Sequence, residues 1–377
     1  MARTCTAEPG VTFVELVRAT LKHSLVPFCV PEQKTITIGG AVAGCSIESM
    51  SYKYGGFHDS CLEYEVITAK GEVLTCTPDN GNKLVFQMVH GTFGTLGIIS
   101  CLKFKLTPAK PYVKVTNEKY PSVEAYQAGI LKHYREQDAD FMDGMIFSAT
   151  ECVLCIGNFV DEAPYAHNYE WMRIYYEMAQ NQQEDYMRTI DYFFRYDKGT
   201  THVDLKSPLS RFLFGRFVGS TNVLWFAQTF HKILPASIIP VVIDVFLPFE
   251  KLAEFLAWHE QETHYFPLWC VPYKAVHSYE WLSEKFHANR QSDLLVDIAI
   301  YAMKTNDNAA YYRKLELKLL ELGGLKTLIA DNYFTPEEFW QTWNKDNYYA
   351  VKQITDPQNI FRDLYEKTVQ GVRGLGR

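Results

Sequence analysis

Residues 35–57 read TITIGGAVAGCSIESMSYKYGGF, and this stretch decides which fold the chain is expected to have. Its alternating Thr and Ile predict a buried strand that ends at Gly39 and Gly40. Small and hydroxyl-bearing residues follow, including Gly44, without a charged recognition pattern. Glycine lets a backbone approach a ligand closely, and successive free N–H groups in such a turn hold anions. The stretch therefore predicts either a ligand platform or a tight turn, and its glycine spacing is not the dinucleotide G-x-G-x-x-G pattern.

A second glycine-rich stretch is HGTFGTLGII, residues 90–99, in which Gly91, Gly94 and Gly97 recur every three residues before Ile98 and Ile99. A structural turn explains one or two of these glycines more easily than three. Two such loops in one small unit predict one extended ligand with a polyphosphate or a flat ring system. Flavin adenine dinucleotide (FAD) has both.

The composition indicates a globular protein with a large core. The chain has 377 residues, of which 47% are hydrophobic and 21% are charged, and this length predicts about two domains. The net charge is −7 and no Lys/Arg block is present, so nucleic acid is not an expected partner. The N-terminus has no apolar signal core. A cytoplasmic location follows as the expectation, with membrane contact at most peripheral.

The most apolar segment, residues 233–252, is interrupted by three prolines and by Asp244. A membrane-spanning helix needs about 20 mostly apolar residues in a row, so we expect a strand over residues 241–249 followed by a helix. The nine cysteines are an odd number in apolar surroundings, which predicts reduced thiols. Cys152 and Cys155 fall on one strand and would point to opposite faces, so no metal site is expected.

The pattern of elements predicts an α+β fold. A helix is expected over residues 12–24, a hairpin over 62–78, and a strand that ends at Pro108. Amphipathic aromatic-rich helices, such as residues 169–187, are expected next, together with further strands that predict an antiparallel sheet covered on one face. These strands are expected at residues 141–149, 152–160, 241–249, 265–274 and 294–303. Gly323 and Gly324 close one late helix, and Thr335 caps the next with Pro336 in its first turn.

The segments PEQKTITIGGAVAGCSIESMSYKYGGF, EYEVITAKGEVLTCTP and GTFGTLGIIS together resemble the FAD-binding domain of the vanillyl-alcohol-oxidase/p-cresol-methylhydroxylase (PCMH-type) flavoproteins. Within that family they are most similar to the Δ24-sterol reductase (Diminuto/Dwarf-like) group and its bacterial relatives. SRFLFGRFVGS, THYFPLWCVPY, DLLVDIAIY and ADNYFTPEEFW resemble later segments of that group in the same order. The resemblance implies an FAD-binding part at residues 1–107, a substrate or cap domain at 108–326, and a C-terminal segment at 327–377 that returns to the flavin.

The resemblance also implies the residues that would hold FAD. Ile98 or Ile99 would contact the adenine side through backbone groups, and Gly97 is a further cofactor-binding residue. Asn332 and Tyr333 would face the flavin as candidate catalytic residues, with Tyr333 or water supplying a proton. The residues expected along the pyrophosphate, ribityl chain and ring, or beside them, are Glu32, Thr37, Ile38, Gly39, Gly40, Gly44, Cys45, Ser46, Ile47, Glu48 and Ser49.

One departure from the family concerns the pyrophosphate-binding glycine loop, which lies in an N-terminal subdomain. The segment MARTCTAEPG resembles the last strand of that subdomain, so the sequence predicts that the rest of it is absent and that FAD occupancy is reduced. No covalent flavin attachment is assigned, and His58 is interpreted as a surface or packing histidine.

The expected activity is FAD-dependent oxidoreduction of a hydrophobic substrate, namely reduction of a C=C bond in a sterol-like molecule with NAD(P)H. An alcohol or polyol oxidase or dehydrogenase is one alternative, and a non-catalytic binding protein is another. Residues 193–202, FFRYDKGTTH, are interpreted as a solvated turn in preference to a substrate gate. Asp297 interrupts an apolar strand and is expected to have a basic or hydrogen-bonding partner. Trp269, Cys270 and Tyr273 are interpreted as core in preference to a pocket wall.

Overall fold

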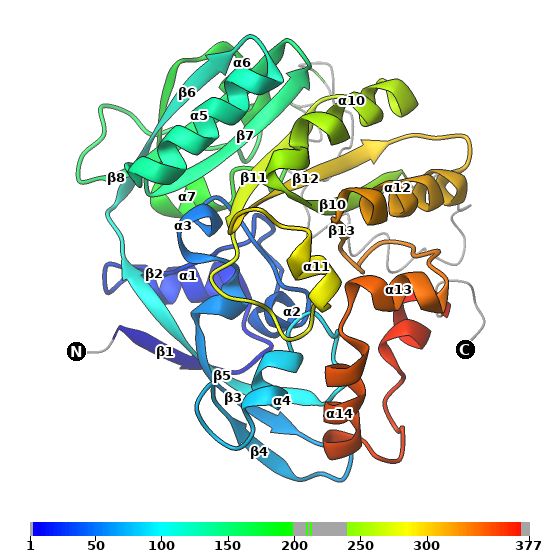
Figure 1. The fold of residues 1–377 in the computed structure, drawn as a ribbon. Coiled ribbons are helices and arrows are strands. Elements are labelled where there is room, and N and C mark those ends of the chain that lie inside the picture. Colours follow the sequence, from blue (N-terminus) through cyan, green and yellow to red (C-terminus); the bar gives the residue numbers. More distant parts are fainter. Residues whose placement is uncertain (1–2, 199–208, 210–211, 213–239, 371–377) are drawn as a thin grey trace.

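The computed structural model describes all residues except 1–2, 199–208, 210–211, 213–239 and 371–377. Two antiparallel sheets organise the described residues, with the smaller sheet at the bottom of Figure 1 and the larger sheet at the top. Helices accompany both sheets, so the predicted α+β class is confirmed. The strands of the smaller sheet lie within residues 4–108 and those of the larger sheet within residues 112–326.

The smaller sheet has the strand order β1-β5-β3-β4, and β2 also pairs with β5. The hairpin β3–β4 lies within the predicted residues 62–78 except for its first residue. The strands are β1 Thr4–Ala7, β2 Leu25–Pro27, β3 Cys61–Ile67, β4 Val73–Cys76 and β5 Ile98–Pro108. The helices beside them are α1 Phe13–Leu21, α2 Ile38–Ala43, α3 Ser51–Tyr54, η1 Phe57–Ser60 and α4 Lys83–Met88.

The larger sheet has the strand order β13-β10-β12-β11-β7-β8-β6-β9. Its strands are β6 Tyr112–Tyr120, β7 Phe141–Ser148, β8 Glu151–Val160, β9 Glu184–Arg188, β10 Val241–Pro248, β11 Leu268–Lys274, β12 Leu294–Met303 and β13 Leu325–Lys326. The helical elements of this half are α5 Val123–Glu136, α6 Tyr175–Asn181, α7 Thr189–Phe193, η3 Phe249–Lys251, α10 Leu252–Thr263, α11 Glu284–Ala288 and α12 Asn308–Leu322. The chain continues with α13 Pro336–Thr342, α14 Lys345–Thr355 and η4 Glu366–Gln370.

Both faces of the larger sheet are buried, because side chains of successive strand residues point to opposite faces. One face packs with residues of α5, α10 and α12 in a core that includes Cys152 and Cys270. The other face joins the core of the first hundred residues and includes Cys155 and Tyr273. Cys152 and Cys155 therefore point to opposite faces, as predicted, and all nine cysteines are free thiols.

Two predicted elements are wrong. The segment TITIGG is a helix start instead of a strand end, because the Thr37 hydroxyl accepts the N–H of Gly40 and caps α2. β-Branched residues favour strands, and here a cap and tertiary contacts override that preference. Within residues 169–187, the aromatic-rich segment forms the short helix α6 and then the edge strand β9.

Helix ends with strong local signals are where the sequence places them. Thr12 and Thr335 each form a capping box, with Glu15 and Glu338 respectively. Gly323 ends α12 with a left-handed φ of 71°. In the part of the chain that the structure describes, no helix is long and apolar enough to cross a membrane.

Candidate flavin site

The two glycine-rich stretches meet at one groove, which has a volume of about 260 Å³. Gly39 and Gly40 come from α2, and Gly94 comes from the loop before β5. An added Cβ at Gly94 would have its nearest neighbour at 3.9 Å, so the groove is open at that backbone. The groove is lined by Pro9, Gly39, Gly40, Ala43, Val89, Thr92, Phe93, Gly94, Leu96, Gly97, Ile98 and Ile99.

The glycines of the groove have two different roles. A Cβ at Gly39 would lie 2.5 Å from Cβ of Pro9, and a Cβ at Gly97 would lie 2.7 Å from Cγ1 of Val66. Close packing therefore requires glycine at these two positions, which is the turn interpretation of the sequence. At Gly94 nothing packs so closely, and the backbone itself forms the surface.

The free N–H cradle expected at Gly39 and Gly40 is not present. The N–H of Ile38 donates to the carbonyl of Val11, and that of Gly39 donates to the carbonyl of Pro9. The N–H of Gly40 donates to the Thr37 hydroxyl. These donors are used within the protein, so the groove offers shape and backbone contact here, and an anion would need donors from elsewhere.

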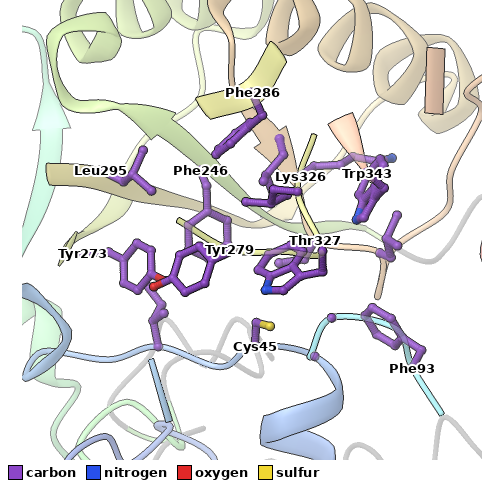
Figure 2. Close-up of a pocket in the computed structure, with 17 residues that line it drawn as sticks. Cys45, Phe93, Phe246, Tyr273, Tyr279, Phe286, Leu295, Lys326, Thr327 and Trp343 are labelled. Carbon is purple, nitrogen blue, oxygen red and sulfur yellow. The ribbon is translucent and has the colours of Figure 1, made fainter. Parts of the chain in front are cut away.

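A second hollow, a cavity of about 40 Å³, lies between the end of α2 and the larger sheet. Figure 2 shows Cys45 and Phe93 on one side of it, and Tyr273, Tyr279 and Lys326 on the other. The full lining is Gly44, Cys45, Ile47, Gly91, Phe93, Phe246, Tyr273, Tyr279, Trp281, Leu282, Phe286, Leu295, Leu325, Lys326, Thr327, Leu328 and Trp343.

Phe93 lines both hollows, so the groove and the cavity adjoin at this residue. Its backbone has a left-handed φ of 51°, which is unusual for a residue with a side chain. Its carbonyl accepts Nζ of Lys367 at 2.6 Å, and its N–H donates to the carbonyl of Ala43. These contacts hold Phe93 at the junction.

Helix α14 holds the rest of the same loop. The Tyr348 hydroxyl donates to Oγ1 of Thr95 at 2.9 Å, and Nζ of Lys352 donates to the Thr95 carbonyl at 2.9 Å. Lys352 also pairs with Asp356 at 2.7 Å, and both side chains are buried. Residues 348–367 thus fix the loop that lines the groove and the cavity.

The cavity walls are mostly aromatic or aliphatic, and Lys326 is their one cationic side chain among the lining residues. Its Nζ pairs with Oε1 of Glu316 at 2.6 Å, and both side chains are fully buried. Burial lowers the pKa of Lys326, and the Glu316 carboxylate opposes that shift. The sequence did not predict Lys326 as a site residue. It ends the segment RKLELKLLELGGLK, which is fully explained as a helix with a glycine stop.

Comparisons with known proteins find sequence similarity to FAD-binding proteins. Residues 1–77 match the family model of FAD binding domains. Human Delta(24)-sterol reductase is 28% identical over 388 residues, which covers 97% of this chain and 74% of that protein. This chain resembles the Δ24-sterol reductases along nearly its whole length. Delta(24)-sterol reductase of Arabidopsis thaliana is 24% identical over 422 residues, with 98% and 73% covered. Cytokinin dehydrogenase 1 of Arabidopsis thaliana is 28% identical over 140 residues, 36% of this chain and 24% of that protein.

The residues present fit a flavin cofactor of the kind that the FAD binding family model implies. The open backbone at Gly94 suits an extended dinucleotide, and the aromatic walls with one lysine suit a flat, electron-accepting ring. The cavity volume of about 40 Å³ is smaller than such a ring, so aromatic side chains have to turn aside to admit it.

The residues that the flavoprotein resemblance implies for FAD binding fall into three groups in the structure. Gly39, Gly40, Gly97, Ile98 and Ile99 line the groove. Gly44, Cys45 and Ile47 line the cavity. Glu32, Thr37, Ile38, Ser46, Glu48 and Ser49 line neither hollow.

Glu48 and Ser49 belong to a buried ion-pair cluster with Arg195. Nη1 of Arg195 lies 3.1 Å from Oε1 of Glu48, and Nη2 lies 2.9 Å from Oδ1 of Asp143 on β7. Arg195 is 1% exposed and its guanidinium lies 4.0 Å from the ring centroid of Tyr192. The interpretation of this segment as a solvated turn is therefore wrong for Arg195, while His202 lies outside the described residues.

Three acidic residues approach one another on the inner face of the larger sheet. Burial and Asp244 raise the pKa of Glu32 to about 8, and burial raises the pKa of Asp244 to about 6. Burial, Asp244 and Glu32 raise the pKa of Asp297, whose Oδ1 has no hydrogen-bond partner within the described residues. A basic or hydrogen-bonding partner was expected for Asp297; a hydrogen bond from the Val245 backbone acts to lower its pKa, and its charged neighbours are acidic.

Asn332 and Tyr333 do not line the cavity. The Asn332 amide is buried and donates to the carbonyls of Ala330, at 2.7 Å, and Thr368, at 3.1 Å. The Tyr333 ring stacks on Tyr312 at 6.4 Å between centroids. Their catalytic roles stay a prediction.

Tyr273 lines the cavity, whereas Trp269 and Cys270 do not. Tyr279, which accepts a hydrogen bond from Tyr273, and the buried Asp59 were not predicted as site residues. Asp59 and Tyr279 lie far apart in the sequence, so no local pattern connects them. His58 is 1% exposed, so it is a packing histidine as expected, and burial lowers its pKa.

Proposed function

We propose that this chain is an FAD-dependent oxidoreductase that reduces a C=C bond of a hydrophobic, sterol-like substrate with NAD(P)H. The observation that carries the proposal is the junction at Phe93, where the glycine-lined groove adjoins the aromatic cavity. An extended cofactor with a nucleotide at one end and a flat ring at the other matches this path. The resemblance to Delta(24)-sterol reductases over 97% of the chain supports the substrate class.

FAD, when bound, supplies hydride transfer. The chain would hold its nucleotide part along Gly40 and Gly94, and its ring against Gly44, Cys45 and the cavity wall. Lys326 contributes to that wall while its Nζ pairs with the buried Glu316, and the surrounding aromatic side chains exclude water. Excluding water strengthens every charge interaction at the reacting atoms.

Apolar walls support a sterol or lipid over a polyol. A polyol would bury several hydroxyl groups, and each buried hydroxyl without a partner costs about 1–3 kcal/mol. The cavity offers few polar side chains, among them Lys326, Thr327 and the two tyrosines. The division into a cofactor part at residues 1–107, a cap at 108–326 and a returning segment at 327–377 is part of this proposal, as is a cytoplasmic, at most peripheral location.

The test is a flavin spectrum and a reduction assay on the purified chain after incubation with FAD. We expect bound flavin absorption, bleaching by NAD(P)H, and addition of two hydrogens to a sterol with a C24 double bond, measured by mass spectrometry. Failure to retain FAD would refute the proposal and favour a non-catalytic binding protein. Retained FAD with oxidation of an alcohol or polyol, and no reduction of the sterol, would favour the oxidase alternative.

A matched pair of variants connects the spectrum to the groove. Gly40 lines the groove in a helical conformation, and a Cβ there would lie 3.1 Å from Oγ1 of Thr37, so Gly40→Val adds a side chain beside the groove and the cap of α2. Gly81 is exposed with no atom within 4 Å of an added Cβ, so Gly81→Val is the control. We expect Gly40→Val to weaken FAD binding at least about tenfold, the equivalent of about 1.4 kcal/mol, and Gly81→Val to leave it unchanged.

A further inference from the structure

Two hydrogen bonds and one ion-pair contact lead from the cavity to the protein surface. The Tyr273 hydroxyl donates to the Tyr279 hydroxyl, and both residues line the cavity. The Tyr279 hydroxyl donates to Oδ2 of Asp59 at 3.0 Å. Nε2 of His277 lies 3.4 Å from Oδ1 of Asp59, and the His277 side chain is 41% exposed. We call these four residues the Tyr273–His277 relay.

The inner end of the relay is fixed by the larger sheet. Tyr273 pairs with Leu295 in the β11–β12 register, and both side chains line the cavity. Paired residues of neighbouring strands lie on the same face of a sheet. The Tyr273 and Tyr279 rings are nearly parallel, at 15° and 6.4 Å between centroids. Figure 2 shows the two rings side by side at the cavity wall.

The middle of the relay is a buried carboxylate. The Asp59 side chain is 1% exposed, and its Oδ2 also accepts the N–H of Gly56 at 2.7 Å. Gly55, just before it, has a left-handed φ of 79°, and a Cβ there would lie 2.3 Å from Oδ2 of Asp59. Glycine is therefore required for the turn that presents Asp59 to Tyr279.

The outer end of the relay is a titratable group near neutral pH. The hydrogen bond to Asp59 raises the pKa of His277, burial opposes the shift, and Glu280 adds to it. Three other histidines are close, but burial lowers the pKa of His58, of His90 and of His287. Burial raises the pKa of Tyr273 and of Tyr279, so these phenols keep their protons at rest. His277 is thus the group of this set suited to exchange protons with solvent.

We propose that the Tyr273–His277 relay delivers the proton that completes the reduction of the substrate alkene. The inference rests on the proposed function, since a C=C reduction consumes one hydride and one proton. Reduced FAD, when bound, would supply the hydride that forms a C–H bond at one alkene carbon. The Tyr273 O–H bond breaks as its proton forms the C–H bond at the other carbon.

The relay then restores Tyr273 without net change. The Tyr279 hydroxyl, which donates to Asp59 at rest, turns toward Tyr273, and its proton moves to the Tyr273 oxygen. A proton from Nε2 of His277 then passes through the Asp59 carboxylate to the Tyr279 oxygen. Solvent reprotonates His277 at the surface. The two electrons come from the hydride alone, which NAD(P)H supplies to the flavin, so no other reductant is required.

This assignment differs from the role predicted for Tyr333. Tyr333 stacks on Tyr312 and does not line the cavity, whereas Tyr273 lines it and is hydrogen-bonded toward solvent. A proton donor has to lie within hydrogen-bond reach of the reacting atom, directly or through one water. Position therefore favours Tyr273.

The experiment measures the proton-dependent half of the reaction by itself. FAD-loaded protein is reduced with dithionite, and flavin reoxidation by a sterol with a C24 double bond is followed in H₂O and in D₂O. We expect Tyr273→Phe and Tyr279→Phe to slow reoxidation about 10²–10⁴-fold, the usual contribution of general acid–base catalysis, and to change the solvent isotope effect. Reduction of the flavin by NAD(P)H should keep its wild-type rate, because that step does not use the relay.

The matched control is Tyr311→Phe. The Tyr311 hydroxyl is buried on α12 and has no hydrogen-bond partner within the described residues, and Tyr311 does not line the cavity. This variant should retain the wild-type reoxidation rate and isotope effect. A folding defect in Tyr273→Phe or in Tyr279→Phe would show as a lower unfolding temperature. The reoxidation rate and isotope effect of the variant that folds normally then test the relay.

A second readout needs no cofactor. The pKa of His277, measured by NMR in the FAD-free protein, should fall by about one unit in Asp59→Asn. It should rise in Tyr279→Phe, because Asp59 then loses one donor and attracts the imidazolium proton more strongly. An unchanged pKa in both variants would show that the four residues are not connected.

The outcomes separate the two proposals. Wild-type protein that reduces the sterol, with both phenylalanine variants equal to it in rate and isotope effect, overturns the relay alone. Wild-type protein that binds no FAD, or that binds FAD without reducing the sterol, overturns the proposed function and the relay with it.

Discussion

Replacing Arg195 by methionine tests whether the buried ion-pair cluster holds the two sheets together. Methionine preserves most of the volume of the side chain and removes its charge, which leaves Glu48 and Asp143 buried without their cation. Removing one partner of a buried ion pair costs about 3–5 kcal/mol. The guanidinium also lies over the Tyr192 ring at 4.0 Å, a contact worth up to about 2 kcal/mol when desolvated. We therefore expect Arg195→Met to lose at least about 3 kcal/mol of unfolding free energy.

The pH dependence of that loss gives a second check. Burial raises the pKa of Glu48 in the folded protein, and Arg195 opposes this shift. Without the guanidinium the folded-state pKa of Glu48 rises further above its unfolded value. The folded variant then retains protons that the unfolded chain has released, so its stability falls as pH rises from the ordinary glutamate value of 4.5. The difference from wild type should be smallest near pH 5 and larger near pH 8.

Urea unfolding followed by tryptophan fluorescence measures both effects. The matched control is Arg18→Met on the exposed face of α1, where surface substitutions change the free energy by less than about 0.5 kcal/mol. A loss below about 1 kcal/mol for Arg195→Met, or a loss that does not depend on pH, would refute the reasoning.

Three further substitutions test other parts of the structure. Gly91→Ala should cost about 1–2 kcal/mol in urea unfolding, because Gly91 has a φ of 63° and a Cβ would lie 3.2 Å from Cε3 of Trp281; wild-type stability would contradict the left-handed turn. Thr335→Ala should cost about 1 kcal/mol, because it removes the capping box with Glu338, and a stability change near zero would show that the cap contributes nothing. The pKa of Glu32 is raised to about 8 in the folded protein, so its contribution to stability is complete below pH 4.5 and is lost as pH rises through about 8. The side chain of Glu32→Gln stays neutral, so the thermal stability of this variant should fall less than that of wild type between pH 6 and pH 9. Parallel pH profiles of thermal unfolding for the two proteins would contradict the raised pKa.

Local signals in the sequence predicted the elements that depend on neighbouring residues. The capping boxes at Thr12 and Thr335 and the glycine at the end of α12 lie where they were expected. Each involves residues only three or four positions apart, so a sequence window contains all the partners. The segment TITIGG was misread as a strand because alternating Thr and Ile favour strands, and only the Thr37 cap and the carbonyls of Pro9 and Val11 make it helical.

The candidate site was predicted in part. The two glycine-rich stretches do line one groove. This part was predictable because glycine spacing in the sequence indicates where the backbone itself forms a surface. The relay was not predictable, because Asp59 and Tyr279 lie 220 positions apart in the sequence. Arg195 was assigned to the solvent for the same reason, since Glu48 and Asp143 are remote from it and a charged residue is rarely buried unless paired.

The clamp on the groove loop has a consequence for how the protein is made. The loop around Thr95 leaves the ribosome early, but Tyr348, Lys352 and Lys367 fix it across separations of 253 to 274 residues. During synthesis these contacts to the loop are therefore missing for most of the elongation of the chain. High affinity for the cofactor should arise only late in translation, after the larger sheet and the segment beyond α13 have emerged.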